Sequence, residues 1–209
     1  NTIKESVLYA GSAGLANHLS KLDMKNEAKK EFEIKKTRDP FLMVIGSRRN
    51  IIDTQIKYLN EKVEVEEVKI DIKEMYHNKK EYMENYIDKV RSYINKNNHV
   101  IIRPILKSGE EIQGLDYEET KTEVRNLLGE ITSNIIKAME INKILLSGGD
   151  TAIGVCKFLK IDKLKILKEI LPGIPLSEVS NSKLQIVTKA GGFGDEKSLY
   201  KIIKKMGVK

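Results

Sequence analysis

One short stretch combines residue types that together bind phosphate: Ser147-Gly148-Gly149-Asp150-Thr151. Its two glycines allow backbone angles and close approaches that a Cβ would forbid. Asp150 or Thr151 can cap a helix expected over residues 152–159, whose positive dipole end would then lie at the turn. Several N–H groups would point at one spot, as phosphate binding requires. The alternative is a tight turn with a helix cap and no ligand.

Two further turns carry similar chemistry. Gly46-Ser47-Arg48 follows an apolar run at 41–45, and Lys189-Ala190-Gly191-Gly192-Phe193-Gly194-Asp195 follows another at 184–188. The turns offer backbone donors, hydroxyls from Ser47 and Thr151, and cations from Arg48 and Lys189. A polyphosphate needs such groups, because phosphoryl transfer depends on positioning and on neutralising charge on oxygens. Each cation could equally be a solvated side chain at a strand end.

Asp150 is the residue that we expect to take part in chemistry. Its carboxylate could act through a water of Mg²⁺ or accept the proton of a substrate hydroxyl, and a plain helix cap is the alternative. The histidines at 18, 77 and 99 share no spacing typical of a metal cluster, so no protein metal site is predicted. Cys156, the single cysteine, is interpreted as core filling rather than as a nucleophile.

Alternating buried strands and helices must position these turns. Short apolar stretches predict strands at 41–45, 99–105, 144–146, 164–167 and 184–188, and 65–72 is a further strand candidate. Helical periodicity predicts helices at about 53–62 (capped by Asp53), 82–94, 118–139, 152–159 and 196–206, and a plain turn is expected at 171–175. This order predicts an α/β domain with a mostly parallel sheet flanked by helices. All three glycine turns would leave the carboxyl ends of their strands, where such sheets bind ligands.

Composition excludes several classes of protein. The net charge is +7, from 37 basic and 30 acidic residues, but lysines are scattered among glutamates, so no nucleic-acid partner is expected. No apolar run approaches the roughly 20 residues that span a bilayer, so no membrane partner is expected. A single cysteine excludes a disulfide framework and fits a reducing cytoplasm.

Five motifs, in this order, resemble the nucleotide-binding C-terminal part of the four-carbon acid sugar kinase family: Gly11-Ser12-Ala13-Gly14-Leu15-Ala16, Val44-Ile45-Gly46-Ser47-Arg48, Ser147-Gly148-Gly149-Asp150-Thr151-Ala152, Pro172-Gly173-Ile174-Pro175-Leu176 and Thr188-Lys189-Ala190-Gly191-Gly192-Phe193-Gly194. The resemblance implies a two-domain kinase that uses ATP with Mg²⁺ to phosphorylate a hydroxyl of a small sugar acid such as threonate or erythronate. Ser47, the turn at 148–151 and the turn at 191–194 would contact ATP, and residues 172–175 would form a wall for the adenine or a plain loop.

The resemblance also implies a domain organisation. Asn1 is not an initiator methionine, so we expect the chain to be the back part of a longer protein whose upstream domain binds the sugar acid. Residues 1–24 would end that domain or link to it, 25–40 would be a charged connector, and 41–209 the nucleotide-binding domain. A homodimer is left open. The alternative function is a non-catalytic nucleotide or anion sensor on the same scaffold.

Overall fold

The computed structural model describes residues 8–11, 14–16, 18–19, 32–35, 37, 39–47, 49–106 and 111–207. The chain divides into two compact units, Asn1–Glu31 and Phe32–Lys209. In the smaller unit, residues 14–16 and 18–19 are helical. Part of the predicted connector, residues 32–35, belongs to the larger unit, where Phe32 and Ile34 pack against a core. The predicted domain boundaries themselves stay predictions.

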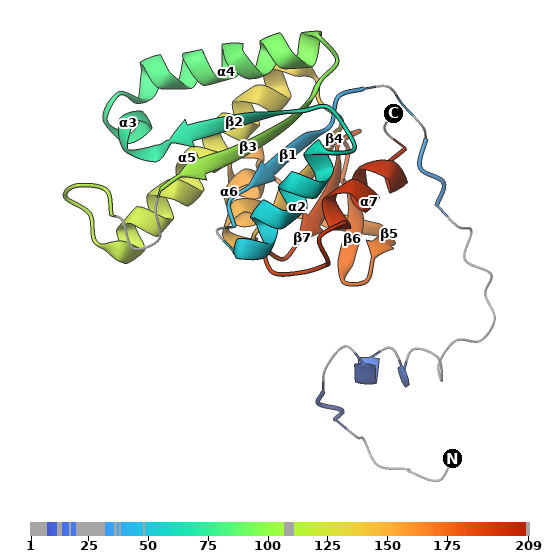
Figure 1. The fold of residues 1–209 in the computed structure, drawn as a ribbon. Coiled ribbons are helices and arrows are strands. Elements are labelled where there is room, and N and C mark those ends of the chain that lie inside the picture. The colour runs from blue at the N-terminus through green and yellow to red at the C-terminus, as the bar shows by residue number, and fades with distance from the viewer. Residues whose placement is uncertain are drawn as a thin grey trace. The chain divides into compact units, whose positions relative to one another are not determined.

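The larger unit is built on a seven-stranded sheet of order β2-β3-β1-β4-β7-β6-β5 (Figure 1). Its strands are β1 Leu42–Ile45, β2 Val65–Asp71, β3 His99–Ile105, β4 Lys143–Ser147, β5 Leu164–Leu171, β6 Ile174–Val179 and β7 Gln185–Lys189. From β2 across to β7 every neighbouring pair is parallel, whereas β6 pairs antiparallel with both β7 and β5. The predicted mostly parallel sheet is therefore confirmed.

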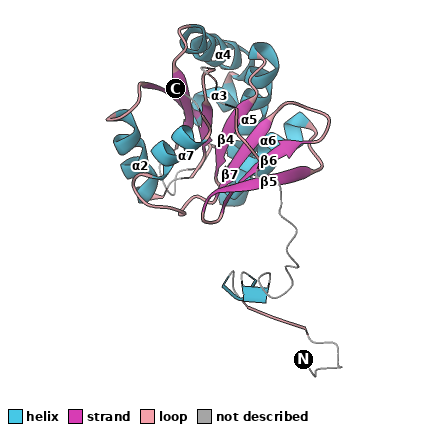
Figure 2. Ribbon diagram, turned by 90° about the vertical axis from the view of Figure 1, so that its right-hand side faces the viewer, coloured by secondary structure: helices cyan, strands magenta, loops and turns pink. Residues whose placement is uncertain are grey.

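Helices cover both faces of this sheet (Figure 2). Helices α2 and α7 pack against one face, and α3, α4, α5 and α6 pack against the other. The helices are α2 Asn50–Asn60, α3 Ile72–His77, α4 Lys79–Asn95, α5 Tyr117–Met139, α6 Gly149–Leu159 and α7 Ser198–Lys205. The boundaries of α5 lie within one residue of the prediction, because a long apolar stripe faces the sheet and Asp116 forms a capping box with Glu119.

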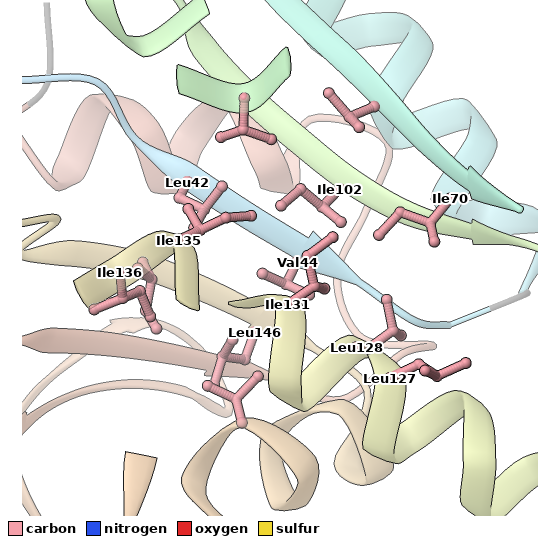
Figure 3. Packing of buried hydrophobic residues seen from close by; sticks show 14 of the residues in the cluster. Leu42, Val44, Ile70, Ile102, Leu127, Leu128, Ile131, Ile135, Ile136 and Leu146 are labelled. Atoms are coloured by element: carbon pink, nitrogen blue, oxygen red, sulfur yellow. The ribbon is translucent and has the colours of Figure 1, made fainter. Parts of the chain in front are cut away.

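The core between the sheet and α5 fixes the register of the central strands. Leu42 lies beside Ile135 of α5 and Val44 beside Ile131 (Figure 3), and Leu146 belongs to the same core cluster. Val44 is paired in register with Ile102 on one side and Leu146 on the other. Burying each such side chain contributes about 1.5–3 kcal/mol, so a slip of register would be costly. The carboxyl ends of β1 and β4 are consequently held side by side.

Strands β1 and β4 form a topological switch point. They are neighbours in the sheet, but β1 continues into α2 on one face and β4 into α6 on the opposite face. Diverging helices leave a crevice at the carboxyl edge of such a pair, where open α/β sheets bind their ligands. The turns that follow β1, β4 and β7 all emerge at this edge, as predicted, because these three strands are adjacent and parallel.

Several local predictions were wrong. Asp53 does not cap α2, which begins at Asn50; its carboxylate instead accepts from Arg103 Nη1 at 2.8 Å. Asp71 unexpectedly ends β2 and caps α3, with its side chain accepting from the amide of Glu74. The stretch 171–175 is not a plain loop, because Ile174 already begins β6 and only the tight turn between β5 and β6 remains.

Candidate functional site

The three glycine turns converge into one cavity. The Gly46 amide donates to Ser147 O at 3.1 Å, and the Gly148 amide donates to Lys189 O at 2.9 Å, so the start of each turn is bonded to the end of the neighbouring strand. A cavity of about 600 Å³ opens above them. Residues of all three turns line it: Gly46, Ser47, Arg49, Gly148, Gly149, Asp150, Thr151, Ala190, Gly191, Gly192 and Phe193.

Two of the glycines allow the turns to approach so closely. A Cβ added at Gly191 would lie 2.8 Å from Ser47 Cβ and nearer still to Ser47 Oγ. A Cβ added at Gly46 would collide with the hydroxyl of Thr151. Because real Cβ atoms essentially never come within 3.0 Å of such neighbours, the first turn can touch the other two only where these side chains are missing.

The second turn presents the start of α6 to the cavity. Gly148 adopts φ +115° and ψ 135°, which disfavours any residue with a Cβ. No side chain caps α6, so the predicted capping roles of Asp150 and Thr151 were wrong. Asp150 is instead exposed in the first helical turn, while Thr151 is only 4% exposed. The first amides of α6 and the positive end of its dipole therefore lie at the cavity.

Lys189 lies beneath the third turn and is 2% exposed. Its Nζ donates to Ala190 O at 3.3 Å and to Gly191 O at 3.2 Å. Removal of the ammonium from water lowers the pKa of Lys189 to about 8. The interpretation of this side chain as a solvated lysine was wrong. A cation held under a turn that lines the cavity raises the electrostatic potential there.

A second cavity of about 380 Å³ adjoins the first and shares Gly46, Arg49, Asp150 and Thr151 with it. Leu106, Val124 and Leu128 give it an apolar wall, and Lys121 and Arg125 line it from α5. Asp150 is therefore the acidic side chain placed where the two cavities meet. The second cavity thus combines an apolar wall with several convergent polar and charged groups, the kind of lining that can orient a small molecule.

Most of the predicted site residues meet here. Seven line the larger cavity: Ser47, Gly148, Gly149, Asp150, Thr151, Gly191 and Gly192. Gly194 lies further along the third turn with φ +85°, against Ser198. Arg48 lies outside the described residues. Residues 172–175 line neither cavity, although the ring of Phe193 rests on Gly173.

Sequence reasoning overlooked two residues of this region. Arg49 lines both cavities. Gln55 of α2 is fully buried beneath the third turn, where its Nε2 donates to Phe193 O at 3.2 Å and to Asp195 O at 2.9 Å. A signal for Gln55 was present, because it falls on the same helical face as the buried Ile52 and Ile56.

Other chemical groups do not form a centre of their own. Within the described ranges, no three His, Cys, Asp or Glu side chains are grouped so that they could hold a metal ion. His99 is buried, which lowers its pKa, and its Nδ1 accepts from the Phe41 amide. Burial raises the pKa of Cys156. Among the described helices, none is both long and apolar enough to cross a membrane.

The open, mostly parallel sheet and the crevice at its switch point place the molecule among doubly wound α/β domains. The chain belongs to the family described as the nucleotide-binding C-terminal domain, whose model matches residues 42–199. The resemblance to the C-terminal part of four-carbon acid sugar kinases is thereby confirmed.

Curated relatives match part of the chain. A D-threonate kinase of Salmonella typhimurium is 40% identical over 75 residues, which cover 34% of this chain and 18% of that protein. A 3-oxo-isoapionate kinase of Paraburkholderia graminis is 30% identical over 87 residues, covering 39% of this chain and 18% of that protein. These matches therefore span less than a quarter of either relative.

Solved structures share the fold. A Haemophilus influenzae protein superimposes with a TM-score of 0.70 at 18% identity, covering 93% of this chain and 45% of that one. A Bordetella bronchiseptica protein, described as a domain-swapped dimer with bound citrate, gives a TM-score of 0.64 at 19% identity, covering 81% of this chain and 41% of that one. This chain thus corresponds to less than half of each.

Proposed function

We propose that this chain supplies the ATP-binding part of a kinase that phosphorylates a hydroxyl of a four-carbon sugar acid such as threonate or erythronate. One observation carries the proposal: three glycine turns from adjacent parallel strands line a single cavity at the switch point of the sheet. Backbone amides, a helix start and a buried lysine at one spot suit a polyphosphate. The names of the curated relatives support the acceptor class.

The residues present fit a nucleotide. The contacts of Gly46 with Thr151 and of Gly191 with Ser47 leave no room for Cβ atoms in the floor, whereas Gly149 and Gly192 face open space. The phosphates would lie on Gly149 and Gly192, with Ser47, Arg49 and Thr151 at the edges. Bound MgATP supplies the transferable phosphoryl group and a cation that neutralises charge on its oxygens. Asp150, which lies between the two cavities, would hold a water of Mg²⁺ or accept the proton of the attacking hydroxyl.

The acceptor is proposed to be bound mainly by a further domain upstream of Asn1. The coverage of the solved relatives, in which this chain matches less than half of each protein, supports that organisation. A homodimer and a cytoplasmic location, where ATP is available, complete the proposal. Sedimentation at several protein concentrations would test the dimer.

Nucleotide binding is tested by Gly149→Val. A Cβ at Gly149 meets nothing within 4 Å, so valine should leave the fold intact but occupy the space proposed for phosphate. MgATP at 100 times its dissociation constant stabilises the wild-type chain by about 2.7 kcal/mol, which appears as a higher melting temperature. Gly149→Val should lose this shift. Ile153→Val on the same helix, an exposed position that lines neither cavity, should keep it.

Catalysis requires a separate assay. The protein that includes the sequence upstream of Asn1 should release ADP from MgATP when threonate, erythronate or a related hydroxy acid is added. ATP binding without ADP release in any of these reactions would favour the non-catalytic sensor. A wild-type melting temperature that MgATP does not change would refute the kinase and a nucleotide sensor, since each requires a bound nucleotide.

A further inference from the structure

The third glycine turn has an unusual distribution of hydrogen bonds. Its carbonyl oxygens are occupied from inside the protein: Ala190 O and Gly191 O accept from Lys189 Nζ, and Phe193 O and Asp195 O accept from Gln55 Nε2. The Phe193 amide closes the turn by donating to Ala190 O at 3.0 Å. Two buried side chains, one from α2 and one from β7, thus draw the carbonyls inward.

The amides of the same turn are arranged in the opposite way. Within the described part of the chain, the N–H groups of Gly191, Gly192 and Gly194 have no hydrogen-bond partner. Gly191 and Gly192 line the larger cavity. The N–H of each residue points away from the carbonyl of the residue before it, so the Lys189 bonds direct the Gly191 and Gly192 amides outward at the cavity that these glycines line. The Gln55 bond to Phe193 O directs the Gly194 amide outward in the same way, further along the turn.

Gln55 makes no other hydrogen bond among the described residues. It is 0% exposed on the apolar face of α2, next to Ile52 and Ile56, and its Oε1 has no partner among the described residues. A buried amide with an unpaired oxygen is destabilising, and an apolar side chain of the same length would avoid that cost. The structural contribution of the Gln55 amide is therefore its two Nε2 hydrogen bonds to the third turn.

We infer that Gln55 and Lys189 are positioning residues, which hold the third glycine turn with its carbonyls inward and its amides available to the phosphate groups of the ligand. Neither side chain needs to touch the ligand. The inference rests on the proposed function in one respect, that the ligand of this turn is a polyphosphate. Beyond the proposed function, the inference identifies the two side chains that orient the turn.

The test compares two substitutions with two matched controls. Gln55→Met and Lys189→Met keep the side-chain length but remove the donors. Gln185→Met is the control for Gln55→Met, because it replaces a glutamine at the start of β7, the end away from the third turn. Lys143→Met makes the second change at the start of β4, where Lys143 Nζ donates to Lys35 O at 2.8 Å and to Met206 O at 3.1 Å, far from the cavity lining. Calorimetry would measure the binding of MgATP and of inorganic tripolyphosphate, at a temperature at which every variant is folded.

Gln55→Met and Lys189→Met should each weaken the binding of both probes by about tenfold, the size expected when oriented hydrogen bonds are lost, whereas both controls should stay within about twofold of the wild type. Equal losses for ATP and tripolyphosphate would locate the effect at the phosphates. Wild-type affinity in both positioning variants would overturn the inference. Failure of the wild-type chain to bind either probe would instead refute the proposed function.

A measurement on the wild-type chain keeps the inference testable if a variant does not fold. By amide hydrogen exchange, the ligand-free chain should protect the Phe193 amide, which is bonded, but not the amides of Gly191 and Gly192. Tripolyphosphate should protect the latter two. If the probe binds and these amides remain unprotected, the turn does not hold the anion and the assignment of Gln55 and Lys189 is wrong.

Discussion

Replacing Gly191 with alanine should force the first and third glycine turns apart. The added Cβ would lie 2.8 Å from Ser47 Cβ, about 1 Å closer than carbon atoms pack at their optimum. Rotation of the serine hydroxyl relieves only the contact with Oγ, because Cβ is fixed to the backbone. One of the two turns must therefore move. Overpacking of this kind costs about 1–3 kcal/mol.

Thermal unfolding followed by circular dichroism measures this cost. For a chain of this size, 1 kcal/mol shifts the melting temperature by about 2–4 °C, so Gly191→Ala should melt roughly 2–12 °C below the wild type. The adjacent Gly192→Ala is the matched control. A Cβ at Gly192 meets nothing within 4 Å, so this variant should stay within about 0.5 kcal/mol of the wild type.

A double-mutant cycle identifies the contact responsible. Ser47→Gly removes the two atoms that lie too close to the new Cβ, so the cost of Gly191→Ala should fall by at least about 1 kcal/mol in that background. Equal melting temperatures for Gly191→Ala and Gly192→Ala would refute the close approach of the two turns. An unchanged cost in the Ser47→Gly background would show that the strain arises elsewhere.

Two other predictions concern charge and packing. Between pH 8 and 10.5 the unfolded chain binds more protons at Lys189 than the native chain does, because the pKa of Lys189 is lowered in the native chain. The free energy of unfolding should therefore rise with pH by up to about 3 kcal/mol relative to Lys189→Met, with no difference in slope below pH 7. Chemical denaturation at each pH measures this, and parallel curves throughout would contradict the lowered pKa. Gly154→Ala should destabilise the chain by about 1–3 kcal/mol, because the new Cβ would collide with the backbone oxygen of Arg125 where α5 and α6 cross. Gly149→Ala, at the open end of α6, is the control and should be nearly neutral. A urea titration in which both variants unfold at the same concentration would exclude the contact between the helices.

The central parallel strands β1 and β4 could be predicted because they are short, continuous apolar runs. Such runs are buried on both faces, as at 41–45 and 144–146, and little else in the sequence competes with that interpretation. The same rule failed for β6, which contains Pro175 and Glu178 and lies in the antiparallel part of the sheet. There the pairing with β5 and β7, rather than the apolar pattern, defines the strand.

The convergence of the turns followed from topology, but their internal support did not. Parallel adjacent strands bring Ser47, Gly149 and Gly192 to one edge whatever the side chains between them. Helical periodicity could indicate that Gln55 is buried, but not that it bonds to backbone oxygens 138 and 140 residues away. Lys189 bonds to the adjacent Ala190 and Gly191, and its burial is what the sequence did not reveal. The starts of α2 and α6 were misplaced because Asp53 and Asp150 were taken for N-terminal caps. Neither helix has a side chain that caps its N-terminus.

The cavity has a consequence for the order of folding. Its walls come from segments after β1, β4 and β7, which stand far apart in the chain, so no early intermediate that lacks the central strand pairings can contain it. A molecule that binds in this cavity therefore binds only chains in which the central strands have already paired. Added ligand should therefore slow unfolding while leaving the rate of the first folding steps unchanged.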